Sequence, residues 1–525
     1  MIGVLLVFIL FGSVFFTSRL FLEPIDEPKS FYLLITALVL LIACSLSKKG
    51  LQNLMASLKS RSLFIGITIV CLLTTVHGLL QYYGFMPTLH RLFPITGAFD
   101  NPAGFAAVQA AMFPFVFISC FDKENRKGFI IFCAIVSLMC LASVILSGSR
   151  TGFLAICAAI AVVLALTDIV SSFFKSHPWL WLPITLLAVT LMIILYYYKQ
   201  DSADGRIFIW SRCFDMIKER PLFGYGHYGF QGHYMMTQAE YFRLNPDSPY
   251  IMIADNVISP FNEYIKLTVN YGLVGLFFSI VLLLSVIRKL FNSDKKTKVL
   301  GLSFVASVFV MCQFSYPFQY NVMWLLIFFA ITPALIQPKK ELVIPGYFRI
   351  IFSTLLIVGL GLSLRNMYYE MKWTEIAIRA RKGRVTRMLP YYEEMKSVMI
   401  SNPLFFYNYS AELNYDKRYK ESLDVIKLCS DSWNDYNVQI LYTDNYAKMG
   451  NIDSALIACD LAYNMIPCRF EPLYRKMLIY GMSGDTVRAV RTAYEILEKP
   501  VKVHSEKLNQ MISTAENVIS HFDDD

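Results

Sequence analysis

Short polar segments between long apolar runs hold the residues of this sequence that are best suited to chemistry. Arg150 lies in the turn LSGSRTG at residues 146–152, beside hydroxyl groups and at the start of an expected helix. Exposed backbone N–H groups, the positive end of a helix and a guanidinium together favour a bound phosphate. The alternative is an arginine that only extends its side chain along the membrane boundary. We favour anion binding because the turn contains no acidic residue.

The polar segment at residues 199–259 supplies two more candidate arginines. Arg206 and Trp210 are four residues apart and would share one face of a helix, whereas Arg212 would point elsewhere. Charges next to lipid are costly, so this segment is expected to face a cavity, a partner or a substrate. An apolar series also predicts that the helix lies on the membrane surface: Trp210, Cys213, Phe214 and Ile217.

Candidate general bases lie later in the same segment and directly after it. Histidine changes charge near neutral pH, so His227 and His233 are candidates, although a single histidine more often only forms hydrogen bonds at a surface. Asn262 and Glu263 begin the next apolar run, which places the Glu263 carboxylate at the positive end of a helix. This carboxylate is either a general base or a helix-terminal residue with no further role.

The sequence GAFDNPA at residues 97–103 precedes another apolar run. Asn-Pro favours a turn followed by a helix start, because proline fits the first helical turn. Asn101 is therefore either a residue that shapes a site or part of an ordinary helix start.

The composition is typical of a membrane protein. Apolar residues make up 56% of the chain and charged residues 17%, with a mean hydropathy of +0.48. About twenty apolar residues cross a bilayer as a helix. The sequence therefore predicts an all-α, polytopic membrane helix bundle with about eleven or twelve spans. Eleven apolar runs support this prediction, near residues 2–20, 31–46, 62–82, 103–120, 128–147, 151–169, 179–198, 262–287, 298–315, 319–336 and 347–365.

Lysine and arginine are concentrated in alternate loops, and this bias predicts the orientation. Basic residues follow the second, eighth and tenth runs, whereas the loop after the first run carries Glu23, Asp26 and Glu27. The even-numbered ends are therefore expected in the cytoplasm, with residues 199–259 and the carboxyl-terminal tail outside. The first run is expected to be a span, since it lacks the basic head and cleavage site of a signal peptide. The net charge of +9 follows from topology, and no nucleic-acid partner is expected.

Residues 366–525 form a second region with nearly balanced charge and a helical period. A 34-residue repeat is visible, in which Tyr446, Gly450 and Ala455 recur as Tyr480, Gly484 and Ala489. A weaker unit is expected at residues 405–432. We therefore predict a membrane domain at residues 1–365 and a tetratricopeptide-like helical repeat domain at residues 366–525. The repeats are either a stabilising cap or a docking surface for a protein partner or a glycan.

Four motifs in order resemble the O-antigen ligase and O-antigen polymerase superfamily. They are NPxGxA from residue 101, SGSRTG from 147, RIFIW from 206 with PLFGYG from 221, and FNEYIK from 261 with YGLVGL from 271. The resemblance covers residues 90–280 well and the rest of the membrane part in outline. No single motif is specific for the family, but the order of the four motifs around a large outer segment is moderately specific. The repeat region resembles versions found in Bacteroidota, in which MIPxRFxPLY, here at residues 465–474, closes the last repeat.

The resemblance implies a metal-independent, inverting glycosyltransferase without a cofactor. An acceptor hydroxyl would attack the anomeric carbon of a glycan linked to a polyprenyl diphosphate, such as undecaprenyl diphosphate, and the lipid diphosphate would leave. Arg150 and Arg206 match family arginines and would bind the diphosphate, with Arg212 a weaker third candidate. Asn101 matches the Asn-Pro turn and, with Trp210 and Asn262, would shape the site. The cysteines show no metal-ligand spacing, and no metal site is expected.

One position departs from the family pattern. The family commonly has His-Asn where this chain has Phe261-Asn262-Glu263, so the expected histidine is absent. The base would then be Glu263, which we favour, or a loop histidine such as His227, or the enzyme would rely on positioning alone.

The resemblance leaves several functions open. The acceptor could be lipid A core in lipopolysaccharide synthesis, a growing polysaccharide chain or a protein hydroxyl. The expected location is the cytoplasmic membrane, with residues 199–259 and the repeats on its periplasmic side and the bilayer as a partner. A transporter of the same lipid-linked glycan would require charges at mid-membrane depth, which are few. A scaffold that works only through its repeats would leave the outer arginines without a role.

Overall fold

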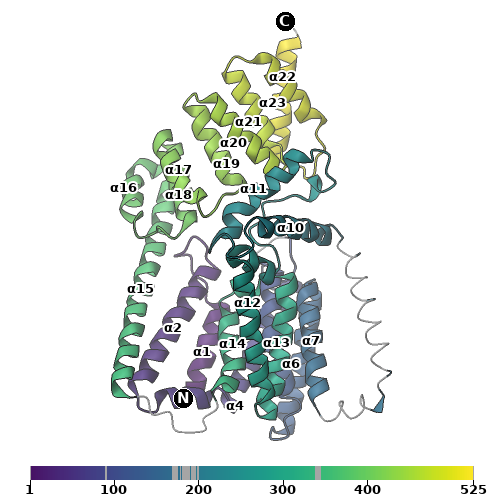
Figure 1. The fold of residues 1–525 in the computed structure, drawn as a ribbon, viewed down its shortest axis with the longest axis vertical. Coiled ribbons are helices and arrows are strands. Elements are labelled where there is room, and N and C mark those ends of the chain that lie inside the picture. Colours follow the sequence, from purple (N-terminus) through teal and green to yellow (C-terminus); the bar gives the residue numbers. More distant parts are fainter. Residues whose placement is uncertain are drawn as a thin grey trace. The chain divides into compact units, whose positions relative to one another are not determined.

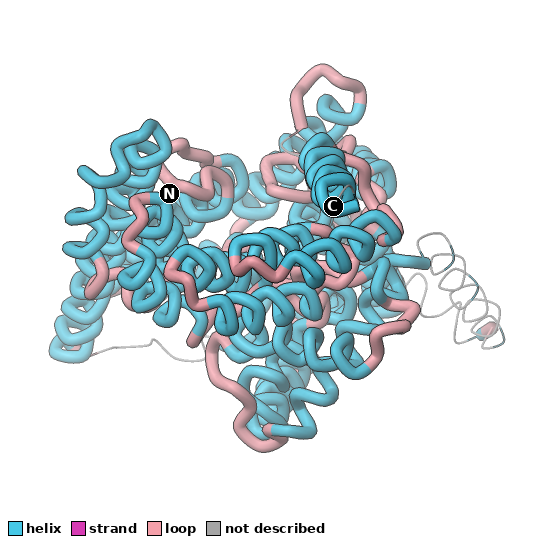
Figure 2. The backbone as a smooth tube through the Cα atoms, turned by 90° about the horizontal axis from the view of Figure 1, so that it is seen from above, coloured by secondary structure: helices cyan, strands magenta, loops and turns pink. Residues whose placement is uncertain are grey.

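The computed structural model describes residues 2–88, 92–167, 200–336 and 345–523, with a few single residues between 168 and 199. Every regular element in these ranges is a helix (Figure 1), and Figure 2 shows the same helices joined by loops. The predicted all-α class is therefore confirmed. The chain divides into two compact units, and each draws on three stretches of the sequence.

Unit 1 contains Met1–Tyr198, Phe261–Tyr264 and Phe278–Thr374. Its described helices are α1 (Ile2–Phe15), α2 (Asp26–Leu46), α3 (Gly50–Ser57), α4 (Arg61–Tyr82), α5 (Pro102–Ile118), α6 (Lys127–Leu146), α7 (Arg150–Leu166), both ends of α12 (Glu263–Phe291), α13 (Lys295–Phe314), η3 (Pro317–Gln319), α14 (Val322–Leu335) and most of α15 (Gly346–Arg379).

Apolar helices of unit 1 correspond to the predicted spans. Six helical segments among the described residues are long and apolar enough to cross a membrane, and four shorter apolar helices accompany them. Together they match ten of the eleven predicted runs, while the run at 179–198 lies outside the described residues. The carboxyl-terminal part of the longest segment extends into unit 2.

Helix α5 forms the centre of unit 1. Nearly all of its residues from Gly104 to Ile118 are buried, which is expected of a helix that is apolar on every face. It packs against α4, α6, α7, α13 and α14. Asn101 and Pro102 define its start, so the polar turn before it is fixed to the most buried helix of the unit.

Unit 2 contains Lys199–Pro260, Ile265–Phe277 and Glu375–Asp525. Its described helices are α10 (Gln200–Glu219), α11 (Gly229–Leu244), η2 (Ile251–Ile253), the middle of α12, η4 (Ala380–Arg384), α16 (Val385–Met395), α17 (Pro403–Tyr415), α18 (Tyr419–Ser430), α19 (Tyr436–Lys448), α20 (Ile452–Met465), α21 (Glu471–Met482), α22 (Thr486–Glu498) and α23 (Glu506–Asp523).

The carboxyl-terminal helices form neighbouring pairs, α17 with α18, α19 with α20 and α21 with α22. Gly450 follows α19 with φ +76° and Gly484 follows α21 with φ +78°, so both repeats turn at a glycine in the left-handed region. Ala455 and Ala489 are buried in the helices that come next. The 34-residue spacing thus marks equivalent helix pairs, and the tetratricopeptide assignment stays a prediction.

Candidate functional site

A polar and aromatic segment between α13 and α14 connects the starts of several helices in unit 1. This junction segment, residues 313–321 (QFSYPFQYN), runs from the last turn of α13 to the residue before α14. It hydrogen-bonds to residues at or near the starts of α2, α5, α7 and α12. Residues from distant parts of the sequence therefore meet at one end of the unit.

Both the oxygen and the nitrogen of the Asn101 side-chain amide form hydrogen bonds at this end. Its side-chain oxygen accepts hydrogen bonds from the Ala103 and Gly104 amides at 2.8 and 3.1 Å, which caps α5. Its amide nitrogen donates to the Tyr316 hydroxyl at 3.2 Å and to the Asp100 carboxylate at 2.8 Å. Asn101 thus caps a buried helix and also contacts the junction segment.

Tyr320 connects the same turn to a buried cation. Its hydroxyl donates to Asp100 Oδ1 at 3.1 Å, and its ring lies edge-on to Phe99. Lys29, near the start of α2, is only 5% exposed. Its ammonium donates to the Ala98 carbonyl, lies 4.4 Å from the Phe99 ring centroid and lies 3.9 Å from Asp26 Oδ1. The turn before α5 and the start of α2 therefore bring two carboxylates, Asp100 and Asp26, together with a lysine that is shielded from solvent.

Helix α12 begins at Glu263, directly after Asn262. Asn262 donates to the Gln313 carbonyl at 3.1 Å and accepts from the Tyr264 amide at 3.0 Å. Glu263 Oε1 accepts from the Phe318 amide at 3.3 Å. Phe261 precedes them with φ +55°, a conformation that costs a phenylalanine about 1–3 kcal/mol and that often occurs at functional sites.

Arg150 is the first residue of α7. Ser149 caps this helix by accepting a hydrogen bond from the Gly152 amide at 3.3 Å. Thr151 donates to the Phe314 carbonyl at 3.4 Å, so the start of α7 is attached to the junction segment. Arg150 itself is partly exposed, as a residue that binds an anion must be.

Helix α10 in unit 2 carries three other predicted residues. The Trp210 indole donates to the Pro260 carbonyl at 2.8 Å, directly before Phe261 in the chain. Arg206 is partly exposed. Arg212 pairs with Asp215 at 2.9 Å, and its guanidinium lies 4.2 Å from the Tyr241 ring centroid. Arg212 is thus already held by a carboxylate and an aromatic ring.

The predicted surface helix is confirmed as a helix, but its buried face differs from the predicted apolar series. Phe214 is 52% exposed, and Trp210 and Ile217 are partly exposed. Side chains that face lipid would be exposed in this way when the chain is considered without a membrane. Cys213, by contrast, is fully buried, as are Phe208, Ile209 and Met216 of the same helix. The free thiol is small and apolar enough for an interior position.

The turn at residues 221–226 enters a break in α12. Gly272 interrupts the helix with φ +66° and ψ −170°. The amides of Leu273 and Val274 donate to the carbonyls of Pro221 and Leu222 at 2.8 and 3.2 Å. The turn is therefore fixed through its backbone.

His227 lies directly after this turn and is exposed. Its Nδ1 lies 3.1 Å from the Tyr271 hydroxyl, and Asn270 donates to its carbonyl at 2.9 Å. His233, in α11, has Nδ1 3.1 Å from the Gly229 carbonyl and its ring 4.5 Å from that of Tyr225. Both ring Nδ1 atoms are thus engaged in hydrogen bonds within unit 2.

The predicted site residues divide equally between the units. Four lie around the junction segment in unit 1: Asn101, Arg150, Asn262 and Glu263. The other four belong to unit 2: Arg206, Trp210, Arg212 and His227.

Sequence reasoning missed the junction segment and Lys29. One local signal existed for the segment, because its tyrosines, glutamines and asparagine separate two apolar runs. No such signal existed for Lys29, since only the tertiary structure places it beneath the turn before α5.

Comparison with known proteins agrees with the resemblance over part of the chain. None of the curated proteins compared with the chain matches it. The family model described as O-antigen ligase (Wzy_C) matches residues 133–280. This range includes the turn with Arg150, helix α10 and the start of α12. Over these residues the chain is similar to the membrane-bound O-antigen ligases, and its apolar helices are those of a multi-pass membrane protein.

Proposed function

We propose that the chain transfers a glycan from a polyprenyl-diphosphate carrier to an acceptor hydroxyl at the outer face of the cytoplasmic membrane. The observation that carries this proposal is the match of residues 133–280 to the O-antigen ligase family, since it includes both Arg150 and Arg206. The junction segment supports it, because it gathers polar helix starts at one end of an apolar unit.

In this proposal Arg150 and Arg206 bind the diphosphate, with Arg212 as a third cation. Guanidinium groups neutralise the charge that develops on the leaving diphosphate as the glycosidic bond breaks. The acceptor oxygen attacks the anomeric carbon from the opposite side, so the configuration inverts, and its proton passes to a base. The reaction needs neither a metal ion nor a cofactor. Asn101, Trp210 and Asn262 position the helix starts and the segment before α12.

The domain organisation follows from the same proposal. Residues 1–365 form the catalytic membrane domain, and residues 366–525 form a repeat domain on the periplasmic side. The repeats offer a surface to a protein partner or to the glycan. In this arrangement the amino terminus lies in the cytoplasm, a proposal based on the distribution of lysine and arginine in the short loops.

Glu263 is the proposed base, and Glu263→Gln tests it. Glutamine keeps an oxygen that can accept the Phe318 amide, so the start of α12 should remain intact. General base catalysis contributes about 100- to 10,000-fold, so release of polyprenyl diphosphate in native membranes should fall by about that factor. The fall in rate toward acid pH should also disappear, because a glutamine has no proton to gain.

His227→Gln provides the comparison. If it removes the acid limb of the pH–rate profile while Glu263→Gln leaves it unchanged, then His227 is the base and Glu263 is not. A normal rate in both variants would show that positioning alone suffices.

Deletion of the gene identifies the acceptor and tests the function itself. Bare lipid A core together with long lipid-linked chains would indicate a ligase, single units on the core a polymerase, and underglycosylated secreted proteins a protein O-oligosaccharyltransferase. Gel analysis of surface glycan and secreted proteins distinguishes the three outcomes. Unchanged glycans on all three acceptors would contradict the proposal.

A further inference from the structure

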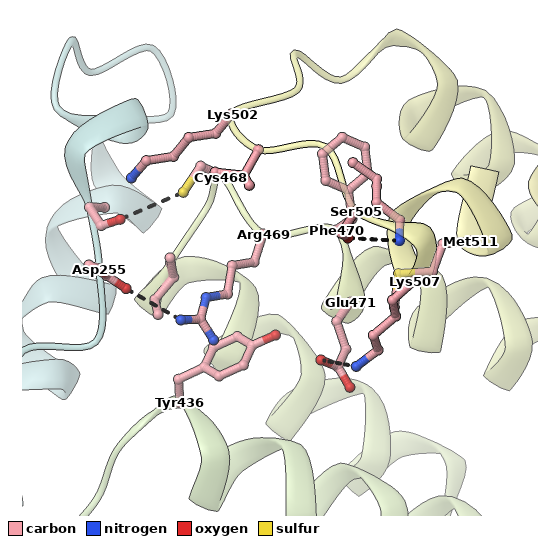
Figure 3. Close-up of a pocket in the computed structure, with 14 residues that line it drawn as sticks. Asp255, Tyr436, Cys468, Arg469, Phe470, Glu471, Lys502, Ser505, Lys507 and Met511 are labelled. Atoms are coloured by element: carbon pink, nitrogen blue, oxygen red, sulfur yellow. Dashed lines mark hydrogen bonds and ion pairs between the residues drawn. The ribbon is translucent and has the colours of Figure 1, made fainter. Parts of the chain in front are cut away.

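A cavity of about 450 Å³ lies wholly within unit 2. It is formed by the segment before α12, the start of α19, the start of α21 and the segment that leads into α23 (Figure 3). Its volume is within the range of about 300–1,000 Å³ found for small-molecule sites. Its polar lining includes Asp255, Tyr436, Arg469, Glu471, Lys502 and Lys507.

The charged side chains leave the cavity with a surplus of positive charge. Arg469 pairs with Asp255 at 3.3 Å, and Lys507 pairs with Glu471 at 3.1 Å. Lys502 is exposed and forms no ion pair with any described residue. Figure 3 shows Lys502 and the Arg469–Asp255 pair at one side of the cavity and the Lys507–Glu471 pair at the other. An anionic group would therefore be attracted to the side with Arg469 and Lys502.

Tyr436 contributes an unused hydrogen-bonding group between these two sides. Its side chain is 1% exposed, and no described residue lies within hydrogen-bond geometry of its hydroxyl. The Arg469 guanidinium lies 4.5 Å from the ring centroid, and in Figure 3 the hydroxyl projects toward Glu471. Burial and the nearby Glu471 raise the pKa of Tyr436 and outweigh the opposing effect of Arg469 and Arg475, so the phenol stays protonated and can donate.

A buried hydroxyl without a partner costs about 1–3 kcal/mol, and buried polar groups in proteins are almost always satisfied. A ligand hydroxyl would supply the missing partner. The Glu471 carboxylate can accept from a second hydroxyl, and Phe470 offers an apolar face to the same cavity. A sugar offers both features that this lining would bind: hydroxyl groups for Tyr436 and Glu471, and an apolar ring face for Phe470.

We propose that this cavity binds an acidic sugar unit of a glycan, with its carboxylate at Arg469 and Lys502 and its hydroxyl groups at Tyr436 and Glu471. The inference rests on the proposed function, because the glycan would be the one that the enzyme transfers or receives. The repeat region then acts as a glycan-binding module.

Equilibrium binding of trigalacturonate to the purified full-length protein in nanodiscs tests the inference. The fully methyl-esterified trisaccharide, which is neutral, is the matched ligand and should bind more weakly. Tyr436→Phe should weaken binding of trigalacturonate about twofold to tenfold, the effect of one hydrogen bond. The same substitution should raise the thermal unfolding midpoint of the ligand-free protein, because it removes an unsatisfied hydroxyl.

Lys502→Gln should weaken binding about twofold to fivefold, and added salt should reduce this difference. Lys427→Gln is the control, since it removes the same charge from α18, outside the cavity. The inference is overturned if the charged and neutral trisaccharides bind equally, if Tyr436→Phe changes stability without changing binding, or if an acidic peptide binds in place of the sugar. Arg150→Ala should bind trigalacturonate normally, so a failure of sugar binding and a failure of glycan transfer are distinguishable.

Discussion

Replacement of Arg150 by alanine should abolish surface glycan in cells that lack the native copy, while the protein stays at its normal level. Loss of one group that stabilises the charge of a leaving oxyanion typically costs about 100- to 1,000-fold in rate. Arg150 is the first residue of α7, and a cation at the amino-terminal end of a helix is unfavourable by about 0.3–1 kcal/mol. This helix-dipole effect alone would make the alanine variant slightly more stable. Quantitative glycan gels and immunoblots of the membrane fraction measure both effects.

Two further variants make the result specific. Arg150→Lys keeps the charge but loses the planar fork, so it should recover only part of the activity. Arg126→Ala removes an exposed arginine before α6 and should leave the glycan unchanged. Normal glycan in the Arg150→Ala strain, at normal protein level, would show that the diphosphate is bound elsewhere.

Gly272→Ala should prevent the protein from accumulating or lower its unfolding midpoint severely. The backbone of Gly272, at φ +66° and ψ −170°, is in a region that only glycine populates readily. An added Cβ would lie 2.1 Å from the Leu222 carbonyl oxygen and 2.5 Å from the Phe223 amide, and backbone atoms cannot move aside as a flexible side chain can. Strain together with the loss of hydrogen bonds to residues 221–222 should cost more than about 3 kcal/mol.

Gly361→Ala is the matched control for this prediction. Gly361 lies inside α15, and nothing is within 4 Å of the position that its Cβ would take. Alanine there should change the stability by less than about 1 kcal/mol, in the stabilising direction. Thermal unfolding in detergent, together with the membrane level of each variant, gives the comparison. Equal stability of the two variants would show that the turn at residues 221–226 does not depend on the break in α12.

Local sequence patterns were sufficient for the helices and their starts. Apolar runs of the right length predicted the helices of unit 1, and Asn-Pro at residues 101–102 marked the start of α5. The equivalent glycines of the repeats were visible because a left-handed turn selects glycine wherever it recurs. These features depend on short-range rules.

The arrangement of the candidate site could not be predicted in the same way. The hydrogen bond between Asn101 and Tyr316 joins residues 215 positions apart, and nothing near either residue encodes it. Cys213 was placed on the lipid-facing side of its helix because the apolar series could not distinguish a face toward lipid from a face toward protein. In a membrane protein the helix face toward lipid and the face toward the protein interior can both be apolar. Hydrophobic periodicity then no longer shows which face is buried, as it does in a soluble protein.

The junction segment has a consequence for how related chains can vary. Its backbone groups at Gln313, Phe314 and Phe318 are hydrogen-bonded to helix starts that lie far away in the sequence. Backbone contacts depend on the spacing of residues rather than on their identity. Among chains built on this plan, Gln313, Phe314 and Phe318 should therefore tolerate changes of side chain, whereas the segment should not tolerate insertions or deletions. A constant loop length would identify it even where no motif survives.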